Sequence, residues 1–250
     1  VIAPDYNATA IHADLFVPVR PGTDVALALA MAKLILDEGL HDEALLREQT
    51  DLPILVRDDT GKFLRESDLV DGGSDETLYR WDRKRGALEI ASTDSLALGA
   101  SDPALEGSFE VETLAGPMTV RPVFERLRAE VAPWTPEAAS RVCGTPPDTI
   151  RRLARMLAEA KAASNVETLC LGKIYHGDAI MRAQILLFVL CGHLGRKGAG
   201  YVAVSNLAPD GHGPILGDHR GLLTPDAKFT RRHAVALVRD HLLRRPPSRA

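Results

Sequence analysis

The sequence predicts an α/β protein with a β-hairpin-rich insertion, and three features indicate this class. A short apolar run from Leu15 to Val19 ends at a Pro-Gly pair, and a helical apolar pattern then continues from Val25 through Leu36. A second apolar run, 166–171, ends at a glycine and precedes a strongly apolar helix over 179–191. Between them, residues 51–121 form short alternating segments broken by turns. Strands that feed helices through glycine turns are typical of α/β domains, and the middle stretch is too long for a bare loop.

The composition describes a folded protein without a nucleic-acid or membrane signature. Hydrophobic residues make up 45% of the 250 positions, enough to bury the core of one large or two ordinary domains. The net charge of −4 gives no general attraction to phosphate backbones, so we expect no nucleic-acid partner. The sequence has no apolar run long enough to span a bilayer, and we expect no direct membrane insertion.

The cysteines and the first residue indicate what other polypeptide segments must supply. Cys143, Cys170 and Cys191 lie far apart and form no Cys-x-x-Cys pair. This spacing encodes neither a disulfide framework nor an iron–sulfur or zinc cluster. The chain begins at Val1 without an initiator methionine or a signal segment. We therefore expect an internal piece of a longer protein.

The turn after the first predicted strand is a candidate nucleotide site. Gly22 lets a ligand approach the backbone, and the first amide N–H groups of the following helix carry the positive end of its dipole. The carboxylate of Asp24 offers two acceptor oxygens that match the N1–H and N2–H₂ donors of a guanine edge. The structural alternative is that Thr23 or Asp24 merely caps the helix. The residues alone leave both interpretations open.

Turn signals place the elements that follow. Glu38-Gly39 ends the first helix, and a second short helix comes next. Within the insertion, residues 109–111 and 118–121 predict a hairpin. We expect Tyr79 and Trp81 to pack the insertion onto the body of the protein, because aromatic side chains usually bury area.

Three helices are expected after the insertion. One starts after Pro122, the next has Thr135 as N-cap and Pro136 at its first position, and the third begins near Pro147. In the third helix an apolar stripe alternates with arginines, which favours a solvated face. Phosphate binding by these arginines is the weaker alternative.

The turn after the second predicted strand is a second candidate site. Gly172 ends this strand, and residues 173–178 lead into the apolar helix. Ligands of open α/β sheets bind at the carboxyl ends of strands, so this turn is placed to contact one. His176 is the side chain of interest, although a histidine that only hydrogen-bonds the turn backbone is the structural alternative.

A glycine-rich segment over 191–201 follows that helix. Its glycines permit tight turns beside a ligand, and Arg196-Lys197 can face phosphates. The order G-x-x-G-x-G without a following helix does not fit a dinucleotide fingerprint, which argues against an NAD-dependent dehydrogenase. Beyond it, the aspartates and histidines within 210–219 match no recurring metal site and indicate a solvated loop. A terminal amphipathic helix is expected over 227–243.

Several of these segments resemble, in the same order, molybdopterin oxidoreductases of the dimethyl sulfoxide reductase family. Pro18–Asp24 followed by an Ala/Leu-rich helix is similar to the segment with which these enzymes hold a guanine dinucleotide, and Asp5–Ala10 matches the run before it. Glu38–Glu43 is similar to the family's "EGLYDEEFV" stretch. Cys191–Tyr201 resembles the family's "TGN-x-G-x-x-G-x-G" element, although His193 stands where asparagine is usual.

The resemblance implies two Rossmann-like parts, built of parallel sheets with flanking helices, that hold one cofactor. Residues 1–162 would form part of one cofactor-binding domain, with the insertion at 51–121, and residues 163–250 the start of a second with an irregular tail. The implied cofactor is bis-molybdopterin guanine dinucleotide with molybdenum or tungsten. The residues that match its binding segments are Arg20, Gly22, Thr23, Asp24, Gly172, Lys173, His176, Gly192 and His193.

The function implied by the resemblance is two-electron oxo-transfer or hydroxylation of a small-molecule substrate, such as the anaerobic respiratory reduction of nitrate-like oxyanions. Iron–sulfur clusters are expected in segments outside this chain or in an electron-transfer partner subunit, at the periplasmic or cytoplasmic face of a prokaryotic membrane. The insertion is most similar to the branch of nitrate, selenate and (per)chlorate reductases and ethylbenzene or dimethyl sulfide dehydrogenases. We expect the chain alone to be inactive. The competing hypothesis is a non-catalytic remnant that acts as a nucleotide-binding or partner-docking module.

Overall fold

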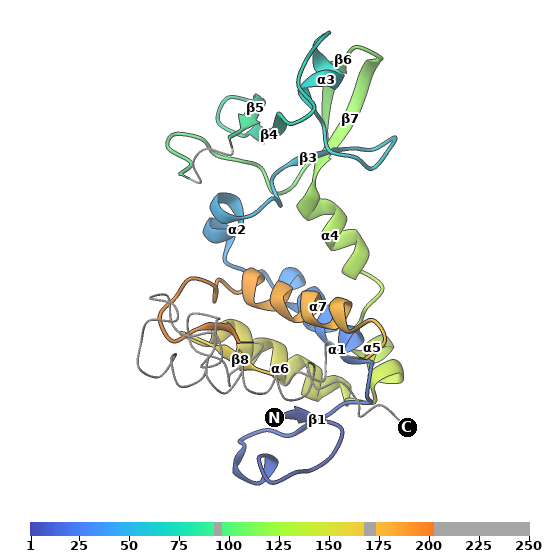
Figure 1. Ribbon diagram of the computed structural model, residues 1–250, viewed down its shortest axis with the longest axis vertical. Coiled ribbons are helices and arrows are strands. Elements are labelled where there is room, and N and C mark those ends of the chain that lie inside the picture. Colours follow the sequence, from blue (N-terminus) through green and yellow to red (C-terminus); the bar gives the residue numbers. More distant parts are fainter. Residues whose placement is uncertain (93–96, 168–173, 203–250) are drawn as a thin grey trace, which may run out of the picture. The chain divides into compact units, whose positions relative to one another are not determined.

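The computed structural model describes residues 1–92, 97–167 and 174–202 (Figure 1). Within these ranges helices are combined with small sheets, so the chain is of mixed helix and strand composition, as the sequence predicts. The chain divides into two compact units, of which the first contains residues 1–164 and 171–200. The second contains residues 165–170 and 201–250. Of the elements named below, only β8 and β9 extend into the second unit.

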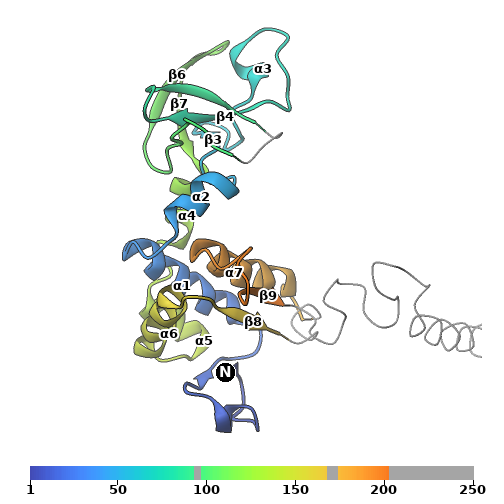
Figure 2. The same cartoon turned by 90° about the vertical axis from the view of Figure 1, so that its left-hand side faces the viewer.

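Helix α1 (Asp24–Asp37) is the centre of the first unit. Helices α5 (Pro136–Cys143), α6 (Pro147–Glu159) and α7 (Gly177–Leu190) all pack against it (Figures 1 and 2). A helix covered on several sides must be apolar around most of its circumference. Its buried residues are Ala26, Leu27, Ala28, Ala30, Met31, Ala32, Ile35 and Leu36, and the many alanines let neighbouring helices approach closely.

A short parallel pair of strands precedes α1. Strand β1 (Ile2–Ala3) pairs with β2 (Val17–Pro18), with Ile2 opposite Val17. The strand expected over Leu15–Val19 is therefore present but shorter. A 3₁₀ turn, η1 (Ala10–His12), lies between the two strands. The strand pairs within the insertion, described next, are antiparallel.

The insertion forms antiparallel sheets. Strands β3 (Leu55–Arg57), β7 (Gly116–Pro122) and β6 (Phe109–Thr113) make one sheet in the order β3-β7-β6, and the hairpin expected from 109–111 and 118–121 is confirmed. Strands β4 (Leu78–Asp82) and β5 (Ala87–Ala91) form a separate hairpin. Helix α3 (Glu66–Leu69) was not predicted; it is a single turn closed by a hydrogen bond from the Arg65 N–H to the Asp68 carboxylate at 2.9 Å.

The insertion has its own hydrophobic core. Leu55, Leu64, Val111 and Val120 are buried in it, and Leu69, Tyr79, Trp81, Leu88, Phe109 and Met118 pack around them. The rings of Trp81 and Phe109 stack with centroids 4.4 Å apart. The expectation that Tyr79 and Trp81 attach the insertion to the body was wrong, because both pack on this internal core. Aromatic burial was predicted correctly, but the sequence does not say which core receives the ring.

Helices α2 (Glu43–Gln49) and α4 (Val123–Val131) flank the insertion in the sequence, and both were expected. Helix α5 begins as the sequence predicts. Pro136 occupies its first turn, and the Thr135 hydroxyl accepts a hydrogen bond from the Ala138 N–H at 3.1 Å. This bond satisfies one of the amide donors that a helix N-terminus leaves without an intrahelical partner.

Replacing Thr135 with alanine should lower the free energy of unfolding by about 1 kcal/mol, because the capped amide of Ala138 loses its acceptor. Urea unfolding followed by circular dichroism measures the change. Thr135→Ser is the matched control, since it keeps the hydroxyl and should remain within a few tenths of a kcal/mol of the wild type. Equal losses for both variants would show that the threonine methyl group, rather than the cap, carries the effect.

Strand β8 (Ser164–Val166) pairs with β9 (Gly200–Val202). Most of the strand expected over 166–171 lies outside the described residues, as do Cys170, the loop at 210–219 and the helix expected over 227–243.

Cys143 and Cys191 are buried free thiols, and burial raises the pKa of Cys191 to about 11. No helix in the described ranges is long and apolar enough to cross a membrane.

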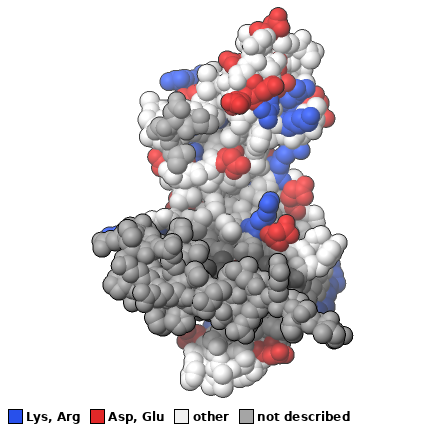
Figure 3. Space-filling view, viewed as in Figure 1, with Lys and Arg blue, Asp and Glu red and all other residues white. Residues whose placement is uncertain are grey.

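The charged side chains of the insertion are mixed in sign. On the face shown in Figure 3, acidic and basic residues are interspersed over the described part of the insertion. Many are paired with each other, as Arg57 is with Asp59 at 2.7 Å and Arg80 with Glu89 at 2.9 Å. On the described part of this face, the charges therefore alternate in sign and form no continuous basic stripe.

Candidate functional site

The first candidate turn connects β2 to α1 through Gly22. This glycine has φ +80°, and a Cβ built on it would meet nothing within 4 Å, so the backbone here faces open space. The Thr23 hydroxyl donates to the carbonyl oxygen of Arg20 at 2.7 Å. Thr23 therefore holds the turn together but does not cap α1, whose N-terminus receives no hydrogen bond from its N-cap side chain. The capping role considered for Thr23 was wrong.

Asp24 occupies the first position of α1 and is partly buried. Burial raises the pKa of its carboxyl above the ordinary value of 3.8, while hydrogen bonds from its own N–H and from the Gly22 N–H act in the opposite direction. These two donors belong to the turn and to the first helical residue. The carboxylate thus closes the turn at the helix entrance, and burial makes its charge costly there.

Arg20 has a clear structural role. Its Nη1 donates to the carbonyl oxygens of Arg141 at 3.0 Å and Val142 at 3.1 Å, and its backbone N–H donates to that of Cys143 at 2.9 Å. These are the last carbonyls of α5, which a helix leaves without intrahelical partners. Arg20 therefore joins the entrance of α1 to the end of α5. Its contact with a cofactor remains a prediction.

The second candidate turn is described only in part. Gly172 and Lys173 lie outside the described residues. His176 is the N-cap of α7, is exposed, and adopts φ +57°, the only positive φ of a non-glycine residue in the described ranges. Its ring lies against that of Tyr175, with centroids 3.9 Å apart. Like α1, helix α7 receives no hydrogen bond from its N-cap side chain.

The two candidate turns lie at the same end of a pair of parallel helices. Helices α1 and α7 pack against each other (Figure 1). The backbone N–H of Asp42, just beyond the end of α1, donates at 2.7 Å to the carbonyl oxygen of Leu190, the last residue of α7. Because their C-terminal ends meet, the two helices run in the same direction. Their N-termini, which begin at Asp24 and Gly177, therefore share an end.

Gly192 and His193 form the C-terminal cap of α7. The Gly192 N–H donates to Val189 at 3.0 Å, and the His193 N–H donates to Phe188 at 2.8 Å, as in a Schellman cap. The His193 ring is fully buried, and its Nε2 lies 2.8 Å from the carbonyl oxygen of Leu157. Since a carbonyl only accepts, Nε2 carries the proton and joins α7 to the end of α6. Cofactor contacts of both residues remain predictions.

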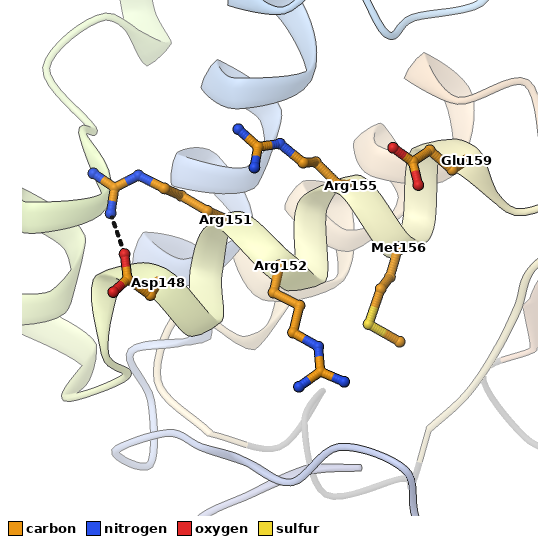
Figure 4. Close-up of a pocket in the computed structure, with 6 residues that line it drawn as sticks. All are labelled: Asp148, Arg151, Arg152, Arg155, Met156 and Glu159. Atoms are coloured by element: carbon orange, nitrogen blue, oxygen red, sulfur yellow. Dashed lines mark hydrogen bonds and ion pairs between the residues drawn. The ribbon is translucent and has the colours of Figure 1, made fainter.

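The arginines of α6 line a shallow groove of about 380 Å³ together with Asp148, Met156 and Glu159 (Figure 4). Arg151 pairs with Asp148 at 3.0 Å and with Glu137, and Arg155 binds both carboxylate oxygens of Glu38 at 2.8 and 2.9 Å. These pairings support the solvated face expected from the sequence. The groove lies along one helix surface, and Arg151 and Arg155 bind carboxylates of the chain itself.

Comparison with known proteins places the chain in a family. No protein-family profile matches it. Dimethylsulfide dehydrogenase subunit alpha from Rhodovulum sulfidophilum is 43% identical over 203 residues, which cover 79% of this chain and 22% of the relative. Chlorate reductase subunit alpha from Ideonella dechloratans is 45% identical over 205 residues, with the same two shares. The chain belongs to the dimethyl sulfoxide reductase family.

A third member of the dimethyl sulfoxide reductase family, perchlorate reductase subunit alpha from Dechloromonas aromatica, is 41% identical over 229 residues, which cover 80% of this chain and 24% of the relative. The resemblance stated from the motifs is thus confirmed. The chain spans about a quarter or less of the length of these three relatives.

The described candidate residues on α1 and α7 fall into two groups in the fold. Gly22, Thr23 and Asp24 lie at the entrance of α1, and His176 lies at the entrance of α7, so the fold brings these four to one end. Gly192 and His193 lie at the opposite end of α7. Sequence reasoning missed Asp42, which contacts the segment after α7. Its only signal was that of an ordinary N-cap before α2.

Proposed function

We propose that the chain is part of the catalytic subunit of a molybdenum or tungsten oxidoreductase and binds bis-molybdopterin guanine dinucleotide. The activity would be two-electron oxo-transfer or hydroxylation, for instance the respiratory reduction of a nitrate-like oxyanion. The observation that carries the proposal is the pair of parallel helices α1 and α7, whose N-termini lack N-cap side-chain bonds and share one end. Relatives named as chlorate, perchlorate and respiratory nitrate reductase alpha subunits support the oxyanion class.

The residues of the first turn suit one guanine nucleotide of this cofactor. The open space at Gly22 admits a ligand close to the backbone, and the first N–H groups of α1 offer donors to an anion. The Asp24 carboxylate would accept from the guanine N1–H and N2–H₂ groups. The partial burial of Asp24 strengthens such a charge-assisted bond, because less water competes for the carboxylate.

The chain's own residues bind and orient the cofactor, while the bound metal supplies the redox chemistry. On this proposal His176 lies beside the pterin at the entrance of α7, where its backbone conformation turns the chain sharply into the helix. Gly172 and Lys173 would complete that turn. Arg20 supports the first turn from behind by holding the end of α5.

The proposal extends to the fold and to partners. Residues 1–162 would belong to one Rossmann-like domain and residues 163–250 would begin a second, with β1 and β2 as the first strands of a parallel sheet. Iron–sulfur clusters, an electron-transfer subunit and a place at a prokaryotic membrane follow from the same proposal. The relatives are named as alpha subunits, which supports an assembly of more than one chain.

The deciding experiment is metal and nucleotide analysis of the complete polypeptide, purified from cells with intact cofactor synthesis. We expect molybdenum or tungsten together with guanine nucleotide released on acid hydrolysis, and dye-linked reduction of an oxyanion such as nitrate, selenate or chlorate. Protein free of both metal and nucleotide would contradict the proposal and favour a non-catalytic remnant. Nucleotide without metal would favour a nucleotide-binding module.

A further inference from the structure

One edge of the sheet in the insertion is open. The strand order is β3-β7-β6, and the hairpin of β6 and β7 can be followed at the top of Figure 1. On the outer side of β3, Phe63 pairs with Val56. Just past β6, the Leu114 N–H donates to the carbonyl oxygen of Asp68 at 2.9 Å, but among the described residues no such bond covers the outer side of β6 itself. Unpaired backbone groups at a sheet edge are what an added strand binds.

The register of the hairpin decides which backbone groups point outward. Thr113 and Gly116 close a two-residue turn and are therefore a hydrogen-bonded pair. Hydrogen-bonded pairs alternate with non-bonded pairs along an antiparallel ladder. The N–H and C=O groups of Glu110 and Glu112 therefore point away from β7. The open edge thus offers the backbone donors and acceptors of these two residues.

The side chains of the same two glutamates carry unpaired charge. Both are exposed and lie on one face of the sheet, where Thr119 and Pro117 of β7 stand opposite them. Neither of those neighbours is charged, and among the described residues neither carboxylate has a hydrogen bond or an ion pair. In contrast, Arg121 of β7 pairs with Asp58 at 3.0 Å. The edge therefore presents two like charges that the described part of the fold does not neutralise.

This charge pattern disfavours one occupant and favours another. Antiparallel pairing with β6 of a second copy would set Glu110 opposite Glu112, and like charges directly opposite each other destabilise a ladder. A strand with Lys or Arg at those positions gains two cross-strand charge pairs instead. On the other face of the edge, Phe109 is only partly buried where it packs on the core of the insertion, so apolar side chains of an added strand would cover it. The complementary segment therefore alternates basic and apolar residues.

We propose that the edge of β6 is a docking site for an extended segment of a partner subunit, in which Lys or Arg alternates with β-branched apolar residues. The outward backbone groups of Glu110 and Glu112 would bind this segment as a fourth strand of the sheet. Its basic side chains would lie opposite the two carboxylates, and its apolar side chains beside Phe109. The inference rests on the assembly of more than one chain in the proposed function, but not on the cofactor.

The test uses the complete polypeptide and a labelled seven-residue peptide of alternating lysine and valine, with a peptide of alternating glutamate and valine as its counterpart. The double variant Glu110→Gln, Glu112→Gln removes both charges and keeps the shape of the side chains. The charge-reversal variant is Glu110→Lys, Glu112→Lys. The matched control is Glu48→Gln, Glu130→Gln, which removes the same charge from exposed positions of α2 and α4.

Fluorescence anisotropy measures peptide binding. The lysine peptide should bind the glutamine double variant about two- to thirtyfold more weakly than the wild type, as expected for loss of two cross-strand charge pairs. The matched control should bind like the wild type, and the charge-reversal variant should prefer the glutamate peptide.

Hydrogen exchange distinguishes an added strand from plain charge attraction. Exchange over 107–115 should slow when the lysine peptide binds, because the N–H groups of Glu110 and Glu112 then donate to it. The same stretch should exchange more slowly in the polypeptide purified with its partner subunits than in the polypeptide alone.

Absence of binding, equal binding by the glutamine double variant and its matched control, or binding without slower exchange would overturn the docking site. The glutamates would then only keep the edge from pairing with other strands. Equal exchange with and without partner subunits would overturn the assignment to a partner, as would a dimer of the polypeptide that forms through this edge. Wild-type protein without metal and guanine nucleotide would overturn the cofactor part of the proposed function and leave these results unchanged, so the two failures are distinguishable.

Discussion

Replacing Gly192 with alanine should lower the free energy of unfolding by about 2–5 kcal/mol, the largest effect of any single methyl group added at the glycines of the loop 192–200. Two costs add. The residue has φ +68°, a conformation that costs an L-residue about 1–2 kcal/mol. The new Cβ would also lie 2.3 Å from Oδ2 and 2.8 Å from Cβ of Asp42. Asp42 has little freedom to move, because its displacement would break the cap of α2 and the pair with Arg196.

The matched control for this prediction is Gly195→Ala in the same loop. Gly195 has φ +77° but faces open space, so only the backbone cost of about 1–2 kcal/mol applies. Urea midpoints of the two variants against the wild type measure the difference. Equal losses would show that the contact with Asp42 contributes nothing beyond the backbone conformation. The double variant Gly192→Ala, Asp42→Ala should recover part of the steric loss, since the carboxylate at 2.3 Å is gone while the Cβ at 2.8 Å remains.

The helices were predictable because their signals are local. The apolar pattern of α1, the Pro136 start of α5 and the glycine after α7 all lie within one or two turns of the structure that they determine. Helix α3 gave no such signal, because four residues cannot show an apolar period. It is held by the contact between Asp68 and Arg65. The ends of strand β2 were harder to predict than its presence. Where a strand ends depends on where its partner strand stops pairing with it, here β1.

The position of the candidate site could be predicted only where a local sequence motif marks it. The turn from Gly22 to Asp24 and the turn at His176 follow recognisable strand, turn and helix patterns. The partners of Arg20 and of Asp42 do not, because they are 121 to 154 positions away in the sequence. A side chain's nearest neighbour at that separation depends on how helices pack around α1, and no local pattern encodes it.

This difference between local and distant signals explains which assignments changed. The sequence pattern suggests that Arg196 can face phosphates, because a basic residue in a glycine-rich loop usually faces solvent or anions. In the structure its guanidinium binds Asp42. Gly192 was grouped with cofactor-facing glycines, yet it is the one whose missing side chain is required by the fold. A glycine that packing requires and a glycine that faces open space have the same residue type here, and only three-dimensional contacts distinguish them.

Asp24→Asn should raise the stability of the folded protein and lower its affinity for guanine nucleotide. Burial raises the pKa of Asp24 in the folded state above its ordinary value of 3.8, so ionisation of this carboxyl costs stability. That cost is absent below the unfolded pKa and grows as the pH rises through the folded pKa. Asparagine is neutral throughout. The variant should therefore gain stability relative to the wild type as the pH rises from 3 to 7, while it loses the charge that would hold guanine.

The expected loss of guanine-nucleotide affinity is about 1–3 kcal/mol, the range for removing one charge-assisted, two-point contact. Thermal unfolding of cofactor-free protein between pH 3 and pH 7, together with nucleotide retained after dialysis, measures both effects. Glu38→Gln is a suitable control, since it removes a carboxylate at the other end of α1 and should leave retention unchanged. If Asp24 instead stabilised the helix start, the variant would be less stable at neutral pH and would retain as much nucleotide as the wild type. Opposite signs of the two changes distinguish a ligand-binding carboxylate from a structural one, because only a carboxylate that contacts guanine loses nucleotide when its charge is removed.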